Sequence, residues 1–275
     1  MAPEGVALRV KGILHLVCGR DSGGRSALTK QYVSAPMHIS KPWWEAGLLI
    51  VNAINSTAGL FSGDVIDTSI EVKSGAQMLV TSASANRAHR MPSGLAAVQQ
   101  SMRVASGGWL EIWPTLFIPH AGSHYLQETS IHLEAGSRFL WFETVAPGRV
   151  ASGEAWQFTR FESRFDLTYD SRPIARETYA LTPECPSVRA LRTHFPNACH
   201  ATCYAAGVDF PDDLLAAISE LHHPDCWAGC SRLDGPAIVV RLVAADNLQL
   251  SRALASIRDL LHRGFARAVP ALRRA

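Results

Sequence analysis

Hydrophobic and polar residues alternate with a period of two along the first two thirds of the chain. In the segment 65–72, Ile66 and Ile70 alternate with Asp67 and Glu71. The same alternation recurs in 98–104 and in 155–169. A period of two is typical of strands that bury one face and expose the other. The pattern therefore predicts a β body built from many half-buried strands.

One turn pattern repeats between these strands. Each copy runs from an apolar residue through a glycine back to an apolar residue, as in EVKSGAQML, RVASGGWLE and HLEAGSRFL. The glycines are Gly75, Gly107 and Gly136, at spacings of 32 and 29 residues. A repeated strand–turn–strand unit of about 30 residues indicates stacked hairpins or a β-solenoid-like body. Glycine turns in an ordinary antiparallel sheet are the alternative explanation.

The last third of the chain changes to a helical period. Residues 211–223 and 246–264 each place leucine and isoleucine on one stripe, which predicts two helices. Asp246 is suited to cap the second helix and Gly264 to end it. Between the helices, the apolar segment 236–244 is typical of a buried strand.

These patterns predict a mainly β fold class. We expect stacked hairpins or a β-solenoid-like body of many strands, with two α-helices in the C-terminal third. No long linker rich in proline, serine or glycine divides the chain. We therefore expect a single domain over 1–275, in which 1–182 form the β body and 183–275 add strands and the two helices.

The charge balance and the apolar segments exclude two classes of partner. The 275 residues carry 26 Lys and Arg against 24 Asp and Glu, a net charge of +2, which is too small for a typical nucleic-acid binder. The most apolar windows, AGLLIVNAI and PAIVVRLVAA, are about half the length that spans a bilayer. We expect a cytoplasmic protein that contacts neither nucleic acid nor membrane, with its six cysteines as free thiols.

Cysteine and histidine gather late in the chain, and both suit zinc or nickel. If residues 198–207 form a strand, however, Cys199 and Cys203 lie about 13 Å apart. Thiolates bound to one zinc ion lie only about 2.3 Å from it, so these two cannot share an ion. We expect buried thiols and no tightly bound metal, while a zinc-stabilised binding module remains the alternative. Its weak candidate ligands are Cys199, His200, Cys203, His223 and Cys226.

Catalytic motifs are scarce. The sequence contains no G-x-S-x-G, P-loop, G-x-G-x-x-G or H-E-x-x-H. Asp64 and Asp67 could serve a carbohydrate-active β-solenoid enzyme, with a platform of tryptophans, but residues three apart on a strand point to opposite faces. That platform would consist of Trp109, Trp113, Trp141 and Trp156. We expect a protein that is not an enzyme.

Several short polar strings follow one another in a characteristic order. They are GLFSGD (59–64), TSASANRAHR (81–90), LEIWPTLFIPHAGS (110–123), WFETVAPGR (141–149) and GE (153–154), and a later strand is GCSRLDGPAIVVRL (229–242). In order and spacing they resemble the urease accessory protein UreD (UreH) family over about 25–265. The chain departs from that pattern at Ala58, Ala83, Arg87, His89 and His120, and it lacks the Pro-Arg-x-Trp ending of the family.

The resemblance implies a scaffold for urease maturation, with a twisted β-solenoid-like body and two helices. Members of the family bind the accessory protein UreF, which recruits the GTPase UreG. Together they dock on apo-urease and deliver nickel to its dinuclear site. The resemblance also implies an internal passage through which nickel travels, so that nickel is in transit and no cofactor stays bound.

A passage for nickel needs weak, successive oxygen and nitrogen ligands, because a thiolate cage would trap the ion. By residue type we expect the metal path or a partner contact at Asp64, Glu111, Glu143, Glu154 and Glu177. Acids at sheet ends are also commonly solvated or paired with arginine. A structural turn and ion pair is expected at Gly63, Gly148 and Arg149.

Overall fold

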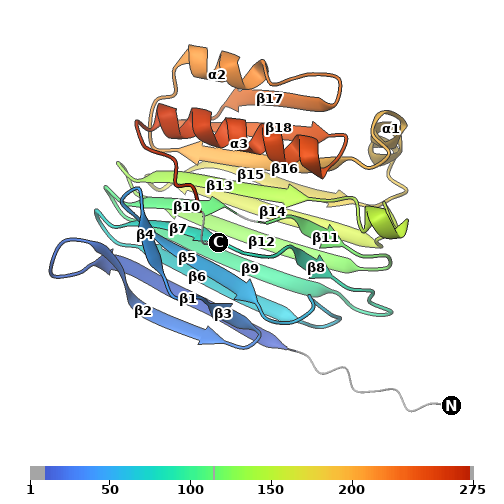
Figure 1. Ribbon diagram of the computed structural model, residues 1–275, viewed down its shortest axis with the longest axis horizontal. Helices are drawn as coiled ribbons and strands as arrows, with labels where there is room; N and C mark the ends of the chain where they lie inside the picture. The colour runs from blue at the N-terminus through green and yellow to red at the C-terminus, as the bar shows by residue number, and fades with distance from the viewer. Residues whose placement is uncertain (1–9, 114, 273–275) are drawn as a thin grey trace.

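The computed structural model describes residues 10–113 and 115–272, and these form two β-sheets stacked face to face (Figure 1). The seven-stranded sheet has the order β15 (Arg172–Leu181), β14 (Arg160–Tyr169), β12 (His124–Leu133), β9 (Ala96–Val104), β6 (Val65–Val72), β1 (Lys11–Arg20) and β2 (Ser26–Ser34). The eleven-stranded sheet has the order β17 (Cys226–Arg232), β18 (Ala237–Ala244), β16 (Cys199–Ala206), β13 (Arg138–Val145), β10 (Trp109–Trp113), β7 (Gln77–Thr81), β5 (Leu48–Asn55) and β3 (Met37–Ile39). The short strands of the second sheet are β4 (Trp43–Glu45), beside β5, and the pair β8 (Asn86–Ala88) and β11 (Phe117–Pro119), which joins β13.

The chain winds between the two sheets as a solenoid does. From β6 to β7, β9 to β10 and β12 to β13 it leaves the seven-stranded sheet and enters the other. Successive windings stack in parallel, so that β6, β9, β12 and β14 form one parallel ladder and β5, β7, β10 and β13 another. The predicted mainly β, solenoid-like body is therefore confirmed.

The repeated glycines lie at the crossings between the sheets. Gly75, Gly107 and Gly136 have φ angles of 68°, 71° and 77°, a conformation that costs glycine little. The turns lie one above the other, and the Gly107 amide donates to the Gly136 carbonyl at 3.2 Å. Each glycine turn thus joins strands of different sheets, whereas the two strands of an antiparallel hairpin would lie side by side.

Three helices follow in the C-terminal third. The two predicted helices are α2 (Asp212–Ser219) and α3 (Asn247–Gly264), and the Asp246 side chain caps α3 by accepting from the Gln249 amide at 2.9 Å. A third helix, α1 (Pro186–His194), was not predicted, because Val188 is its one buried residue and no apolar stripe marks it. A short 3₁₀ turn, η1, covers Val150–Ser152. No helix within the described ranges is long and apolar enough to cross a membrane.

Apolar side chains fill two layers. One layer lies between the sheets and includes Leu16, Met102 and Trp141. The other lies between the outer face of the eleven-stranded sheet and helices α2 and α3, where Leu254 and Ile257 of α3 pack over β16 and β18 (Figure 1). Burying an apolar side chain of this size contributes about 1.5–3 kcal/mol to the stability of the fold. Helix α3 is therefore held against the sheet chiefly by burial of its apolar stripe.

Candidate functional site, a polar seam between the sheets

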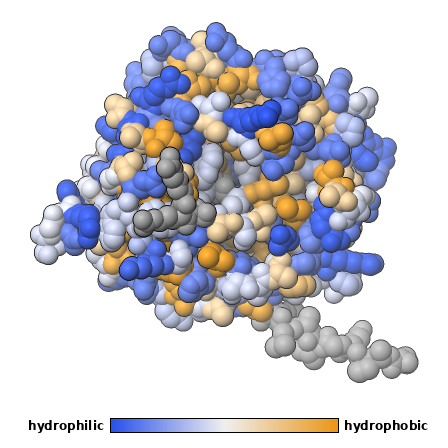
Figure 2. All heavy atoms as spheres, in the orientation of Figure 1, coloured by the Kyte–Doolittle hydropathy of each residue, from blue (hydrophilic) through white to orange (hydrophobic). Residues whose placement is uncertain are grey.

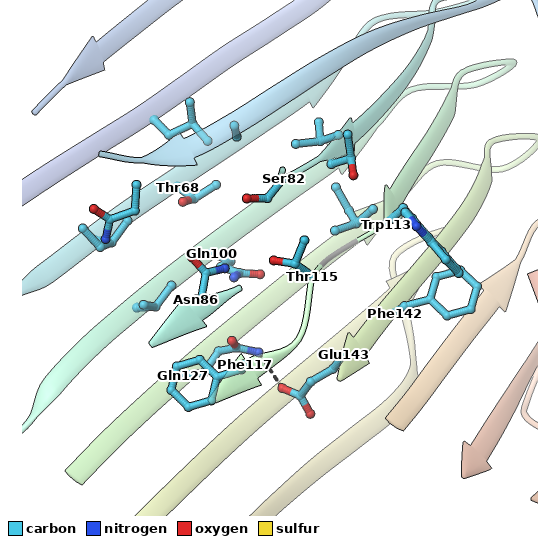
Figure 3. Close-up of a pocket in the computed structure, with 18 of the residues that line it drawn as sticks. Thr68, Ser82, Asn86, Gln100, Trp113, Thr115, Phe117, Gln127, Phe142 and Glu143 are labelled. Carbon is cyan, nitrogen blue, oxygen red and sulfur yellow. Dashed lines mark hydrogen bonds between the residues drawn. The ribbon is translucent and has the colours of Figure 1, made fainter. Parts of the chain in front are cut away.

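A cavity of about 180 Å³ interrupts the apolar layer between the two sheets. Amide and hydroxyl side chains line one side of it, including Thr68, Gln100 and Gln127 (Figure 3). Among the described residues of its wall, Glu143 is the one acidic or basic side chain. The cavity is therefore uncharged apart from a single carboxyl group.

The parallel register places these polar side chains in rows. Thr68, Gln100 and Thr129 are partners on β6, β9 and β12, and Val98, Gln127 and Ser163 are partners on β9, β12 and β14. Because equivalent positions of successive windings face the same way, a polar residue at one inward position lies beside the next. The hydroxyl oxygen of Thr129 is buried and has no hydrogen-bond partner among the described residues.

Glu143 lies on β13 at the edge of the cavity and is 7% exposed. Its carboxylate accepts a hydrogen bond from Gln127 Nε2 at 2.7 Å (Figure 3). It also accepts from Tyr179 OH at 2.7 Å and Ser163 Oγ at 3.3 Å. Burial raises the pKa of Glu143 to about 7, the nearby Glu177 adds to the rise, and the three donors oppose it. Near neutral pH this carboxyl group therefore exists in both protonation states.

Glu177 is the next carboxylate along the same direction. It lies on β15, two residues before Tyr179, and accepts hydrogen bonds from Tyr204 OH at 2.8 Å and from Arg241 Nη1. The Glu177 side chain is 20% exposed and that of Arg241 is 53% exposed, so the line of polar groups reaches solvent here. Thr202 lies between Glu143 and Arg241 in the register of β13, β16 and β18.

We call this line the polar seam. It begins with Thr68, Gln100 and Gln127, continues through Glu143, Ser163 and Tyr179, and ends at Glu177, Tyr204 and Arg241. Its possible ligand atoms are carboxylate, amide and hydroxyl oxygens, which bind divalent cations such as nickel less tightly than thiolates do. The arrangement can hold or pass a cation in successive weak steps.

The other three predicted acids lie outside the seam. Glu111 is fully buried on the opposite face of the eleven-stranded sheet, where Arg258 and His262 of α3 bind it. Glu154 pairs with Arg149 and accepts from the Ala121 amide at 3.3 Å. Asp64 lies in the turn before β6. The structure thus brings together two of the five acids, Glu143 and Glu177.

The loop around Gly148 shows why glycine is needed in the predicted turn. Gly148 has a φ of 134°, and a Cβ there would lie 2.4 Å from the Glu154 carbonyl oxygen. Gly63 also has positive φ, at 85°. The ion pair between Arg149 and Glu154 closes the same loop. Both glycines therefore occupy backbone conformations that other residues rarely adopt.

Most of the cysteines and tryptophans singled out in the sequence are buried. Cys199 and Cys203 are buried on β16, the strand predicted at 198–207. His200 lies between them, and its Nε2 atom is buried without a hydrogen-bond partner among the described residues. His223 and Cys226 form a backbone bridge at the start of β17. Within the described ranges, no three His, Cys, Asp or Glu side chains are grouped to hold a metal ion. Trp109, Trp141 and Trp156 are 1%, 3% and 5% exposed, and Trp113 is partly buried against the core. These four residues therefore do not form the exposed platform expected for a carbohydrate-active enzyme.

Several members of the seam were not predicted. Tyr179, Tyr204 and Ser163 carry no motif that marks them in the sequence. Gln100 could have been identified from the sequence, because it is a polar residue on the apolar face of the alternating segment 98–104. Arg241 could also have been identified, since it is the one charged residue inside an otherwise apolar strand.

The geometry of Asp64 leads to a prediction about stability. Asp64 is 5% exposed, and its oxygens accept from the Val10 amide at 3.0 Å and the Phe61 amide at 2.8 Å. Asp64→Asn replaces one acceptor by a donor that faces a backbone N–H, so we expect a loss of about 1–3 kcal/mol in the free energy of unfolding. Urea denaturation of both proteins measures it. Unchanged stability would show that these two hydrogen bonds contribute nothing to the fold.

Comparison with known proteins gives a consistent result. A family model described as UreD urease accessory protein matches residues 10–275. The protein named Urease accessory protein UreD from Opitutus terrae is 36% identical over 263 residues, which cover 93% of this chain and 96% of the relative. Proteins of the same name from Acetivibrio thermocellus and Haloarcula marismortui are 28% and 31% identical, over 88% and 84% of this chain and 94% and 79% of their own lengths.

Proposed function

Because the chain belongs to the UreD family of urease accessory proteins, we propose that it is a non-catalytic scaffold in urease maturation and that nickel crosses it along the polar seam. The observation that carries the proposal is the pair of carboxylates between the sheets. Glu143 is held by Gln127 and Tyr179, and Glu177 is held by Tyr204. Nickel is the cargo of this process, and no cofactor stays bound.

The chemistry of the seam suits a cation in transit. A carboxylate binds a metal in its deprotonated form, so a nickel ion that reaches Glu143 displaces the proton held there near neutral pH. Gln127 and Tyr179 keep the carboxylate oriented through their hydrogen bonds at 2.7 Å. Oxygen ligands release nickel more readily than thiolates, so the ion can move on to the next group.

The partners in this proposal are those of the family. A UreF-like protein binds the scaffold in the cytoplasm and recruits a UreG-like GTPase that supplies nickel, and apo-urease receives the metal. Large apolar side chains on the surface support a protein that works in a complex, and examples are Tyr32, Phe61 and Leu248, which are 60%, 46% and 57% exposed. On the face seen in Figure 2, apolar residues reach the surface in patches between hydrophilic ones.

The test is urease activation in cells that express the urease subunits together with all accessory proteins. Glu143→Gln keeps the size of the side chain but removes its charge, so we expect active urease to fall by about tenfold or more. The complex with the UreF-like protein should persist, as pull-down would show.

Glu128→Gln is the matched control. Glu128 lies beside Gln127 on β12 but on the outer face, where it pairs with Arg164 at 2.7 Å. This variant should activate urease normally. Full activation by the Glu143 variant would contradict passage along the seam, and joint loss of activation and complex would point to a structural role.

A further inference from the structure

The polar seam ends in an ion pair at its solvent side. One oxygen of Glu177 accepts from Arg241 Nη1 and the other accepts from Tyr204 OH at 2.8 Å. Each carboxylate oxygen therefore accepts one hydrogen bond, one from a cation and one from a neutral hydroxyl. A metal ion bound beside Arg241 would lie close to the guanidinium, and the two positive charges would repel one another.

Arg241 is an unusual residue for its place in the fold. It lies in the middle of β18, whose sequence AIVVRLVA is otherwise apolar and mostly buried. Its guanidinium reaches between the sheets to Glu177, yet its side chain is 53% exposed. An ion pair with this much exposure contributes little to stability, so the side chain can turn into solvent without disturbing the strand.

Tyr204 would keep the carboxylate in place when Arg241 leaves. Its ring stacks on Phe165 with a centroid distance of 4.1 Å and an interplanar angle of 9°. Tyr204 itself is 2% exposed. The Glu177 carboxylate is therefore held by a buried partner, whereas Arg241 is the more exposed member of the ion pair.

We propose that Arg241 is a displaceable plug, whose guanidinium occupies the Glu177 carboxylate at the outer end of the seam until a divalent cation takes its place. This inference rests on the proposed function, because it takes nickel as the cargo. Arginine and nickel compete for Glu177, since both are cations attracted to this carboxylate and they repel one another. The apparent affinity of the seam for metal is then the intrinsic affinity multiplied by the fraction of molecules in which the plug is open.

The test is calorimetric titration of the purified full-length chain with nickel chloride. If the open state is about 10% populated or less, Arg241→Gln should lower the dissociation constant for nickel by about tenfold or more. The double variant Arg241→Gln, Glu177→Gln should lose that gain. Arg241→Met, which keeps the apolar stem and removes the charge, should reproduce it and serves if the glutamine variant fails to fold.

Arg176→Gln is the matched control, because Arg176 is the residue before Glu177 but pairs with Asp166 and is 80% exposed. It should bind nickel as the unmodified chain does. Two results would overturn the plug: nickel affinity that is unchanged or weaker in both Arg241 variants, or a gain that persists without Glu177.

These outcomes are separate from those that test the proposed function. The titration involves no urease, so tighter binding by Arg241→Gln stands even if Glu143→Gln activates urease normally. In the reverse case, Glu143→Gln fails to activate urease and Arg241→Gln leaves the nickel affinity unchanged. That result would support passage along the seam and contradict the proposed role of Arg241.

Discussion

Replacing Glu111 by glutamine is expected to lower the free energy of unfolding by about 3–5 kcal/mol. Glu111 is fully buried and accepts from Arg258 Nε at 2.6 Å and His262 Nε2 at 3.0 Å. Glutamine has nearly the same volume but no charge, so the guanidinium of Arg258, whose side chain is 8% exposed, would remain buried without a counter-ion. Urea or thermal denaturation of the two proteins measures the loss.

Two further variants test this explanation. Glu128→Gln removes an exposed acid and should change stability by less than about 0.5 kcal/mol. Adding Arg258→Met to Glu111→Gln removes the uncompensated charge, and it should recover a large part of the loss. A Glu111 variant as stable as the Glu128 control would show that the buried ion pair contributes nothing.

The role of Glu111 could not be derived from the sequence alone. The alternation around β10 indicates that Leu110 and Glu111 face opposite ways, but both faces of this strand are buried. Leu110 packs between the sheets, while Glu111 lies under α3 and meets partners 147 and 151 residues later in the chain. Nothing local to 110–111 identifies that helix as the cover, so residue type alone could not distinguish an acid in a buried ion pair from one on a metal path or at a partner contact.

The first part of the seam, by contrast, follows from the repeat. The glycines are spaced by 32 and 29 residues, and the same steps lead from Thr68 to Gln100 and from Gln100 to Thr129. These three residues are partners in the parallel ladder. Because every winding of a solenoid keeps the register of the one before, the turn spacing alone predicts which inward side chains lie side by side.

The outer part of the seam has no such basis. Tyr179, Tyr204 and Arg241 belong to β15, β16 and β18, which return antiparallel after the windings have ended. Their register depends on how the chain passes through α1 and the later loops. The antiparallel register cannot be derived from the turn spacing, so Glu177 was predicted by residue type and its partners were not predicted.

Glu143 should make the stability of the protein depend on pH. Its pKa is about 7 in the folded chain against an ordinary value of 4.5, because burial penalises the charged form. The stability it contributes is complete below pH 4.5 and is lost as pH rises through 7. A rise of this size corresponds to about 3 kcal/mol. His200 acts in the opposite sense, since burial lowers its pKa to about 4 and it destabilises the fold as pH falls below 6.5.

Glu143→Gln separates the two effects, because it removes the titrating carboxyl group and keeps His200. Stability from urea denaturation should be measured between pH 4.5 and 8 for the variant and the unmodified chain. The difference, variant minus unmodified chain, should rise by about 3 kcal/mol across this range and level off above pH 7. His200 contributes equally to both proteins and cancels. Parallel pH profiles would show that Glu143 keeps an ordinary pKa in the folded chain, so that its three hydrogen-bond donors offset the cost of burying its charge.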